Sequence, residues 1–198
     1  AVLAGKIPFV SRERCFPAGV PAFEGFRRVG APMLFFLQTE NEVVMIWRVA
    51  QQMRHVYLNV PHSENPKPSW YGESVGRYEG DTLVVDTVGI STKVAVDYYL
   101  TPHTDKLHVV ERYRLIDYEA AKEAWDRAHK EWPQVPSYAP DRDYRGKGLQ
   151  LEFTVEDPGA AMAADRLQRG AVPAVVAVVD DQRPAAVPRD AAADLRRD

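Results

Sequence analysis

Residues Ser74 to Val88, with the sequence SVGRYEGDTLVVDTV, decide the fold class of this 198-residue chain. Two short runs of strand-forming residues flank Glu79-Gly80-Asp81, and such runs around a glycine-containing turn are a strong local signal of a β-hairpin. Paired carboxylates can also perform acid–base chemistry, but a turn is the simpler interpretation, because Gly80 accepts a positive φ and Asp81 closes the turn. The stretch therefore predicts two antiparallel strands.

Further stretches on both sides of this hairpin are rich in apolar, β-prone residues. They are Met33–Gln38, Glu42–Arg48, Met53–Asn59, Leu107–Leu115 and Leu149–Glu156. Strands of this length, separated by turn-rich segments, are typical of all-β folds. The sequence thus predicts a mainly β protein, either an antiparallel barrel or a strongly curved sheet.

One segment does not follow the strand pattern. Residues 118–132 are dense in strong helix formers, with alanines and tryptophans at helical spacing, and Pro133 follows them. We expect one amphipathic α-helix, inserted with a polar loop into the hairpin that the last two strands form. Insertions of this kind are common in functional loops on a rigid scaffold.

The domain organisation follows from length and composition. With 45% hydrophobic residues, residues 1–159 are predicted to form a single β-barrel domain. Residues 1–32, which carry four prolines, are expected to be an arm that wraps the core. Residues 160–198 are rich in Ala, Arg, Asp and Pro. This extension is expected to pack on the body or on a partner subunit, which would make a homo-oligomer.

Charge and cysteine content exclude several classes of protein. The formal net charge is −3, so no nucleic-acid partner is predicted, because such proteins usually carry a strongly basic patch. No apolar run approaches the roughly 18 residues that a membrane span requires. The single cysteine, Cys15, excludes an internal disulfide and a multi-cysteine metal site.

The segment Trp70–Thr87 resembles the core of a large group of poorly characterised bacterial proteins, many of them exported. That core reads Gly-Arg-Trp-Glu-Gly-Asp-Thr-Leu-Val-Val-Asp-Thr, and Tyr78 stands at its Trp position here. Pro102–Arg114 and Phe153–Pro158 also match, and with the region around Cys15 the resemblance covers roughly residues 15–158. The helical insertion and the run GAAMAA after Pro158 depart from the group.

This resemblance implies the fold and the location of a site, but no reaction, because no activity is settled for the group. It also slightly favours a periplasmic or secreted location. The strand–turn–strand pattern is similar, in addition, to the calycin barrels that bind small ligands.

Glu111 is the first candidate for a functional side chain. In an extended Leu107–Leu115, alternate residues share a face, and Glu111 falls on the face that carries leucine, valine and tyrosine. Burying an unpaired carboxylate is costly, so this group must be paired, protonated or part of a site. Two interpretations stay open, namely a structural pair with an arginine and a general acid or base with a raised pKa.

Neighbouring strands place more polar groups on apolar faces. Asp86 alternates with valines, Arg48 with a valine and an isoleucine, and His55 and Tyr57 with Met53. A barrel lumen that holds Glu111, Tyr57, His55 and either Arg48 or Asp86 would be an apolar pocket with convergent polar groups. Small-molecule sites usually have this composition.

The mouth of such a barrel would carry two histidines and two aromatic residues. His103 is either a surface residue of a Thr-Asp turn or a general acid or base at the rim. His62 is either a solvated loop residue or a second group at this rim. Trp70 and Tyr71 either line the pocket or pack beneath the loop.

No metal and no other cofactor is predicted. His55, His62, His103 and His108 could form a two-histidine, one-carboxylate set with nearby acids. However, no His-x-His or His-x-x-x-His spacing supports this set.

The predicted function is cofactor-free acid–base catalysis on a small, mostly apolar molecule, of isomerase, dehydratase, cyclase or lyase type. In this hypothesis Glu111 moves the proton, His103 is its partner, and Tyr57 or Arg48 polarises the substrate. The remaining site residues would contact the substrate; they are Arg48, His55, Asp86, Trp70, Tyr71 and His62. Two alternatives stay open: a non-catalytic binding protein for a hydrophobic ligand, and an assembly subunit that uses its C-terminal tail.

Overall fold

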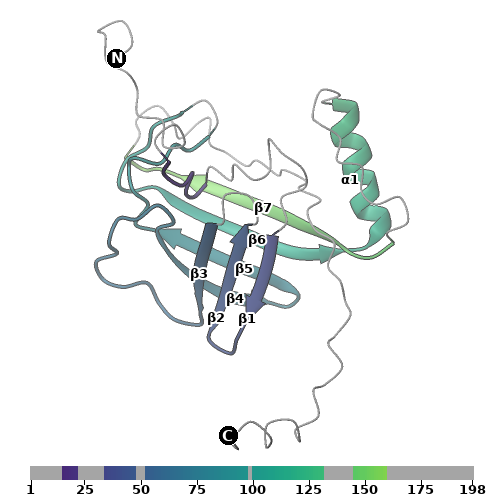
Figure 1. The fold of residues 1–198 in the computed structure, drawn as a ribbon, viewed down its shortest axis with the longest axis horizontal. Helices are drawn as coiled ribbons and strands as arrows, with labels where there is room; N and C mark the ends of the chain where they lie inside the picture. Colours follow the sequence, from purple (N-terminus) through teal and green to yellow (C-terminus); the bar gives the residue numbers. More distant parts are fainter. Residues whose placement is uncertain (1–14, 22–33, 48–51, 98–99, 132–144, 160–198) are drawn as a thin grey trace, which may run out of the picture.

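The computed structural model describes residues 15–21, 34–47, 52–97, 100–131 and 145–159, which form a mainly β structure (Figure 1). The strands are β1 (Leu34–Gln38), β2 (Glu42–Trp47), β3 (Gln52–Leu58), β4 (Glu73–Glu79), β5 (Thr82–Val88), β6 (His108–Ile116) and β7 (Gly148–Glu156). Helix α1 (Tyr118–Glu131) lies between β6 and β7, where the insertion was predicted. Within these residues, no helix is both long and apolar enough to cross a membrane.

The strands form one seven-stranded sheet whose spatial order equals the chain order. Each neighbouring pair is antiparallel except β3 and β4, which run parallel. The parallel pair departs from the fully antiparallel expectation, because residues 59–72 carry the chain back along the sheet before β4 begins. We call residues 59–72 the return loop; it carries His62, Trp70 and Tyr71.

The hairpin of Ser74–Val88 is confirmed. Glu79 pairs with Thr82, so the turn has two residues, Gly80 and Asp81. Gly80 has a φ of +64°, and a glycine with positive φ at the first turn position is typical of a type II′ turn. Any side chain at this position would be strained by the backbone conformation, although a Cβ atom would meet no neighbour within 4 Å.

The sheet curls into a half-barrel, and side chains of β1 and β6 meet across its inside (Figure 1). The ring of Phe36 on β1 meets the ring of Tyr113 on β6 edge-on, with centroids 5.6 Å apart. One buried cluster draws on almost the whole sheet; it comprises Leu34, Val43, Met45, Trp47, Val56, Leu58, Leu83, Val85, Tyr113, Leu149 and Leu151. Burial of this apolar surface is the force that closes the curl.

A second apolar cluster closes one end of the half-barrel. Its buried members are Val20, Ile90, Val94, Val96, Leu107, Val109 and Val155. Trp70 and Tyr71 of the return loop pack against it, and the Val20 amide donates a 3.1 Å hydrogen bond to the Trp70 carbonyl. The described part of the predicted arm, residues 15–21, thus does contact the core, while its other residues lie outside the described ranges.

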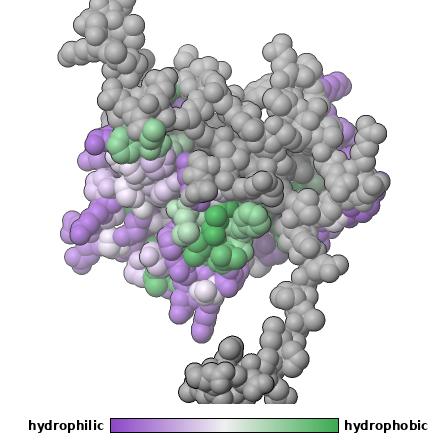
Figure 2. Space-filling view, viewed as in Figure 1, coloured by the Kyte–Doolittle hydropathy of each residue, from purple (hydrophilic) through white to green (hydrophobic). Residues whose placement is uncertain are grey.

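The outer face of the sheet differs between its two halves. On β1 to β3 it is largely apolar, with exposed Phe35, Leu37 and Met53, and Figure 2 shows a hydrophobic patch where Figure 1 draws β1 and β2. On β4 to β7 the outer positions are mostly charged or polar. The predicted extension of residues 160–198 lies outside the described residues, so its packing stays a prediction.

Candidate functional site

Glu111 lies inside the curl and its side chain is 0% exposed, as strand alternation predicted. Its Oε2 accepts a 2.5 Å hydrogen bond from Nη2 of Arg54, and its Oε1 accepts a 2.6 Å hydrogen bond from the Tyr113 hydroxyl. Of the two interpretations left open by the sequence, the structure therefore contains the pair with an arginine. Both carboxylate oxygens have protein partners.

Arg54 connects the four central strands of the sheet from the inside. Its Nε donates to Oγ of Ser74 at 3.0 Å, and its Nη2 also donates to Oγ1 of Thr87 at 2.6 Å. The two hydroxyls are 3.1 Å apart and form a hydrogen bond with each other. We call the five side chains of Arg54, Ser74, Thr87, Glu111 and Tyr113 the interior network.

The pKa values of Arg54 and Tyr113 are both raised in the interior network. Burial alone would lower the pKa of Arg54, but the charge and hydrogen bond of Glu111 outweigh it, so the pKa rises. Burial, followed by the negative charge of Glu111, raises the pKa of Tyr113 well above its ordinary value. At any ordinary pH the guanidinium is therefore charged and the phenol keeps the proton that it donates.

One donor of the interior network has no acceptor among the described residues. Nη1 of Arg54 is buried and makes no hydrogen bond to any of them, and an unsatisfied buried donor costs about 1–3 kcal/mol, more for a charged group. Tyr71 lies within electrostatic reach of this guanidinium. Burial raises the pKa of Tyr71 to about 12, and the positive charge of Arg54 opposes that rise. The vacant donor and Tyr71 mark a polar position inside an otherwise apolar region.

The predicted orientation of β3 is wrong. His55 and Tyr57 point outward, and Tyr57 is 51% exposed. The opposite face of β3, which carries Arg54, Val56 and Leu58, is the buried one. Both faces of this strand carry apolar residues, and burial of two aliphatic side chains together with the Arg54 ion pair decides between them.

Tyr57 and His55 therefore do not lie in a lumen with Glu111. His55 instead places its Nδ1 2.5 Å from Oε1 of Glu42 on the outer face. Arg48, the other predicted partner of Glu111, lies outside the described residues. Sequence reasoning missed Arg54, although its alternation with Val56 and Leu58 was the signal that pointed to it.

His103 is buried, so the alternative of a surface histidine is wrong. Its Nδ1 lies 2.6 Å from the carbonyl oxygen of Thr104, and because a carbonyl only accepts, Nδ1 carries the hydrogen. Nε2 of His103 is buried, and within the part of the chain that the structure describes it has no hydrogen-bond partner. Asp157 holds this turn in place by accepting hydrogen bonds from the amide and the hydroxyl of Thr104.

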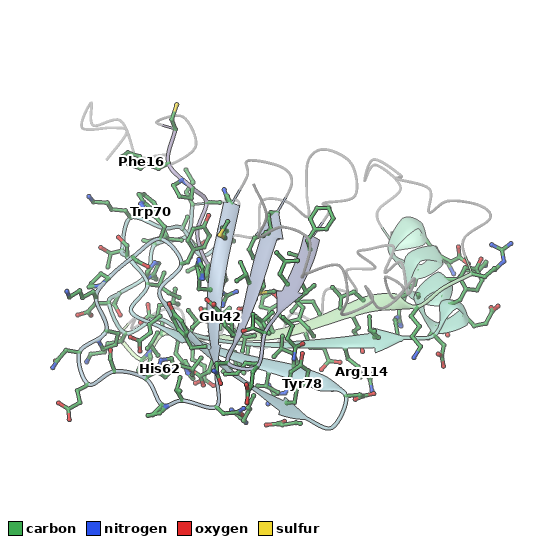
Figure 3. All side chains as sticks on the ribbon, turned by 60° about the horizontal axis from the view of Figure 1, so that its bottom comes forward. Phe16, Glu42, His62, Trp70, Tyr78 and Arg114 are labelled. Carbon is green, nitrogen blue, oxygen red and sulfur yellow. The ribbon has the colours of Figure 1, made fainter. Side chains whose placement is uncertain are left out.

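Trp70 and Tyr71 pack beneath the return loop and cover the second apolar cluster. The ring of Phe16 stacks on the ring of Trp70 with centroids 5.0 Å apart, and Figure 3 shows the two rings together. Of the two predicted aromatic residues, Tyr71 is the one that the electrostatics place near Arg54.

Asp86 lies on the outer face, so its predicted place in the lumen is wrong, and His62, for which a solvated loop position and a rim position were both open, contacts Asp86 there. Asp86 is the outward neighbour of Thr87 and pairs across the sheet with Val75 and Val110. Its Oδ1 lies 2.9 Å from Nε2 of His62 and 3.0 Å from Nε2 of His108. Sequence reasoning did not connect His108 with Asp86, because only the β5–β6 register brings them together.

Glu73 completes this group of side chains. Its Oε1 lies 3.1 Å from Nδ1 of His62 and accepts a 2.7 Å hydrogen bond from the Ser63 amide. Its Oε2 accepts a 2.7 Å hydrogen bond from the Ser63 hydroxyl. We call the four side chains of His62, Glu73, Asp86 and His108 the outer-face cluster.

Across the described ranges, no set of three or more His, Cys, Asp or Glu side chains is placed to hold a metal ion.

Comparisons of the chain with protein-family models, with curated proteins and with solved structures find no match. The resemblance to exported bacterial proteins therefore stays a prediction. The features that bear on function are therefore the interior network and the outer-face cluster, which lie on opposite faces of the sheet.

Proposed function

We propose that this protein binds a small, mostly apolar molecule inside its curled sheet, with an oxygen of the ligand accepting a hydrogen bond from Nη1 of Arg54. The observation that carries the proposal is this buried donor of the guanidinium, for which the described residues supply no acceptor. The other donors of Arg54 are used by Ser74, Thr87 and Glu111. Ligand sites in proteins have this character, with mainly apolar walls and a few fixed polar groups.

Charge balance defines the class of ligand. Arg54 and Glu111 already neutralise each other, so a ligand carboxylate would add an uncompensated buried charge, which is expensive. A neutral carbonyl or hydroxyl oxygen satisfies Nη1 without that cost. The expected ligand is therefore an apolar ketone, ester, amide or alcohol, with the half-buried Tyr71 beside its polar end.

A second candidate function is acid–base turnover of such a ligand, and His103 favours it. In the neutral imidazole, the Nδ1 hydrogen goes to the Thr104 carbonyl, which leaves the lone pair on the buried Nε2, and no described residue makes a hydrogen bond to that atom. A neutral imidazole with this orientation is suited to proton abstraction. In this version His103 is the base, while Glu111 orients Arg54 and moves no proton, because both of its oxygens are engaged.

Binding can be tested with a variant that removes the interior charges without leaving one unpaired. The triple variant Arg54→Met, Glu111→Leu, Tyr113→Phe keeps the volume roughly constant, and replacing a buried ion pair in this way is often neutral or stabilising. The matched control is Arg77→Met, because Arg77 is an exposed arginine on the outer face. The probes are a medium-chain methyl ketone and the carboxylate of the same chain length.

Isothermal titration calorimetry should show ketone binding to the wild type and to Arg77→Met, with the carboxylate binding more weakly. The triple variant should lose about 10- to 100-fold in affinity for the ketone, the usual range for one hydrogen bond to a charged group. Equal affinity in wild type and triple variant would remove Arg54 as the anchor. Tight binding of the carboxylate alone would contradict the charge argument.

Native mass spectrometry of the freshly purified protein addresses turnover as well as binding. A co-purified neutral organic molecule would support the site and give its chemistry. If that molecule is converted by the wild type, His103→Gln should bind it and fail to convert it. Conversion at an unchanged rate in His103→Gln would exclude His103 as the base.

A further inference from the structure

His62 is the side chain of the outer-face cluster that is in contact with two carboxylates. Its Nε2 faces Oδ1 of Asp86 at 2.9 Å and its Nδ1 faces Oε1 of Glu73 at 3.1 Å. The side chain of His62 is 24% exposed, so the contacts are within reach of solvent protons. In Figure 3, His62 lies on the return loop at one side of the sheet, well away from Trp70 on the view.

Both carboxylates are ionised and can only accept hydrogen bonds. Hydrogen bonds from the hydroxyl and amide of Ser63 are the main cause of the lowered pKa of Glu73, and His62 adds to them against a small effect of burial. Burial would raise the pKa of Asp86, but the hydrogen bonds and charges of His62 and His108 outweigh it, so this pKa is also lowered.

A count of hydrogens shows what the two contacts of His62 require. A neutral imidazole has one N–H, whereas two acceptor oxygens face its two nitrogens, so both contacts are hydrogen bonds only in the doubly protonated ring. His108 differs, because its Nδ1 is 3.8 Å from Glu156, which is too long for a hydrogen bond. His108 can therefore satisfy Asp86 with a single N–H.

Backbone hydrogen bonds hold both ends of the return loop, and side chains hold residues 62 and 63. At the start of the loop, the Asn59 amide donates a 2.8 Å hydrogen bond to the Gly76 carbonyl. At the end before β4, backbone hydrogen bonds tie Ser69 to Gly89 and Ser91, and Trp70 to Val20. These bonds do not depend on pH. Near the start of the loop, His62 and Ser63 hold the chain to β4 through Glu73, and His62 holds it to β5 through Asp86.

We propose that His62 is a proton-operated latch that holds the first part of the return loop against the outer face of the sheet. When the ring is charged, it bridges β4 and β5 through Glu73 and Asp86. When it loses its proton, one nitrogen presents a lone pair to a carboxylate oxygen, and that contact breaks. This latch does not depend on the proposed ligand site, which lies on the other face.

The ionisable side chains that contact His62 are two carboxylates, and arginines lie further along the same face, Arg77 on β4 and Arg112 on β6. Glu73 faces His62 from β4 and Asp86 from β5, while His108 of β6 and Glu156 of β7 lie next along the same face. On β2 and β3, Glu42 and His55 pair with each other. The latch is therefore closed at a pH above the range in which the two carboxylates protonate, and it opens as His62 loses its proton.

Hydrogen exchange of the full-length protein, read by mass spectrometry, tests the latch. Wild type and His62→Gln are compared at the same pH, so that intrinsic exchange rates cancel. Glutamine has both of its N–H groups on one nitrogen and cannot bridge two carboxylates in this geometry. The matched control is His55→Gln, which breaks another histidine–carboxylate pair on the same face.

At about pH 5.5, amides of residues 62–67 should exchange at least about tenfold faster in His62→Gln than in wild type and in His55→Gln. At about pH 8.5, all three proteins should exchange alike in this segment. Equal exchange of wild type and His62→Gln at the lower pH would overturn the latch. The latch would also be overturned if the wild type stayed protected from exchange at the higher pH and a chelator removed that protection. That result would indicate a bound cation.

Discussion

The interior network and the outer-face cluster are built from adjacent residues of the same strands. On β4, Ser74 points inward and Glu73 outward; on β5, Thr87 points inward and Asp86 outward. Both groups join several strands through charged hydrogen bonds, but one is sealed and the other is about a quarter to a third exposed, from 24% at His62 to 33% at His108. Neighbouring residues of one strand thus belong to two groups that differ in their exposure to solvent.

The difference shows what burial does to an ionisable group. Inside, Arg54 and Glu111 can exist only as a pair, because removing either charge from its partner leaves the other in a low-dielectric surrounding. Outside, water can solvate a charge that loses its partner, so protons can enter and leave. The interior network is therefore suited to a fixed recognition geometry, and the outer-face cluster to a response to pH.

The largest effect is expected when one half of the interior pair is removed. Arg54→Met should lower the free energy of unfolding by about 3–5 kcal/mol, because Glu111 would stay buried with only the Tyr113 hydroxyl as partner. Urea denaturation measures this loss. The triple variant Arg54→Met, Glu111→Leu, Tyr113→Phe should instead lie close to the wild type.

A triple variant as unstable as the single one would show that the network is needed for the fold itself. If Arg54→Met were as stable as the wild type, water would have to reach Glu111. The charged groups on the two faces of the sheet would then not differ in their access to solvent.

Much of the fold was predictable from local pattern. The hairpin around Gly80, the helix after Asp117 and the inward side chain of Glu111 all follow from alternation, turn chemistry and helix propensity over a few residues. These signals act within one element, so the rest of the chain is not needed to interpret them.

The site was less predictable, because it depends on which face of each strand is buried and on the register between neighbouring strands. Either face of β3 could have been buried, and the choice of the face with Arg54 rests on packing against strands far away in sequence. In the same way, His62 and His108 meet at Asp86 only because β5 pairs with β6 in one register and the return loop crosses that row. Neither fact has a local signature.

A smaller and pH-dependent effect is expected at the outer-face cluster. Asp86→Asn should cost about 1 kcal/mol near pH 6, because the acceptor of two imidazole hydrogen bonds loses its charge while solvent compensates in part. The pKa of Asp86 is lowered in the folded state. Its contribution is therefore present above the unfolded value of about 3.9 and is lost as the pH falls through the folded pKa.

Urea denaturation at a series of pH values checks this sign. The difference in unfolding free energy between wild type and Asp86→Asn should shrink toward zero below about pH 4. A difference that grows on acidification would mean that Asp86 is destabilised in the folded protein, and the latch would lose one of its two anchors.

The smallest effect is expected at the pair of His55 and Glu42, of which only His55 was predicted to lie in the lumen. His55 is about half exposed and its partner is also accessible, so His55→Gln should change the unfolding free energy by no more than about 0.5 kcal/mol. This variant has a similar side-chain volume and leaves the inward face of β3 unchanged. A loss of several kcal/mol would mean that the outward face of β3 is covered in solution, and the two faces of the sheet would then be alike at this strand.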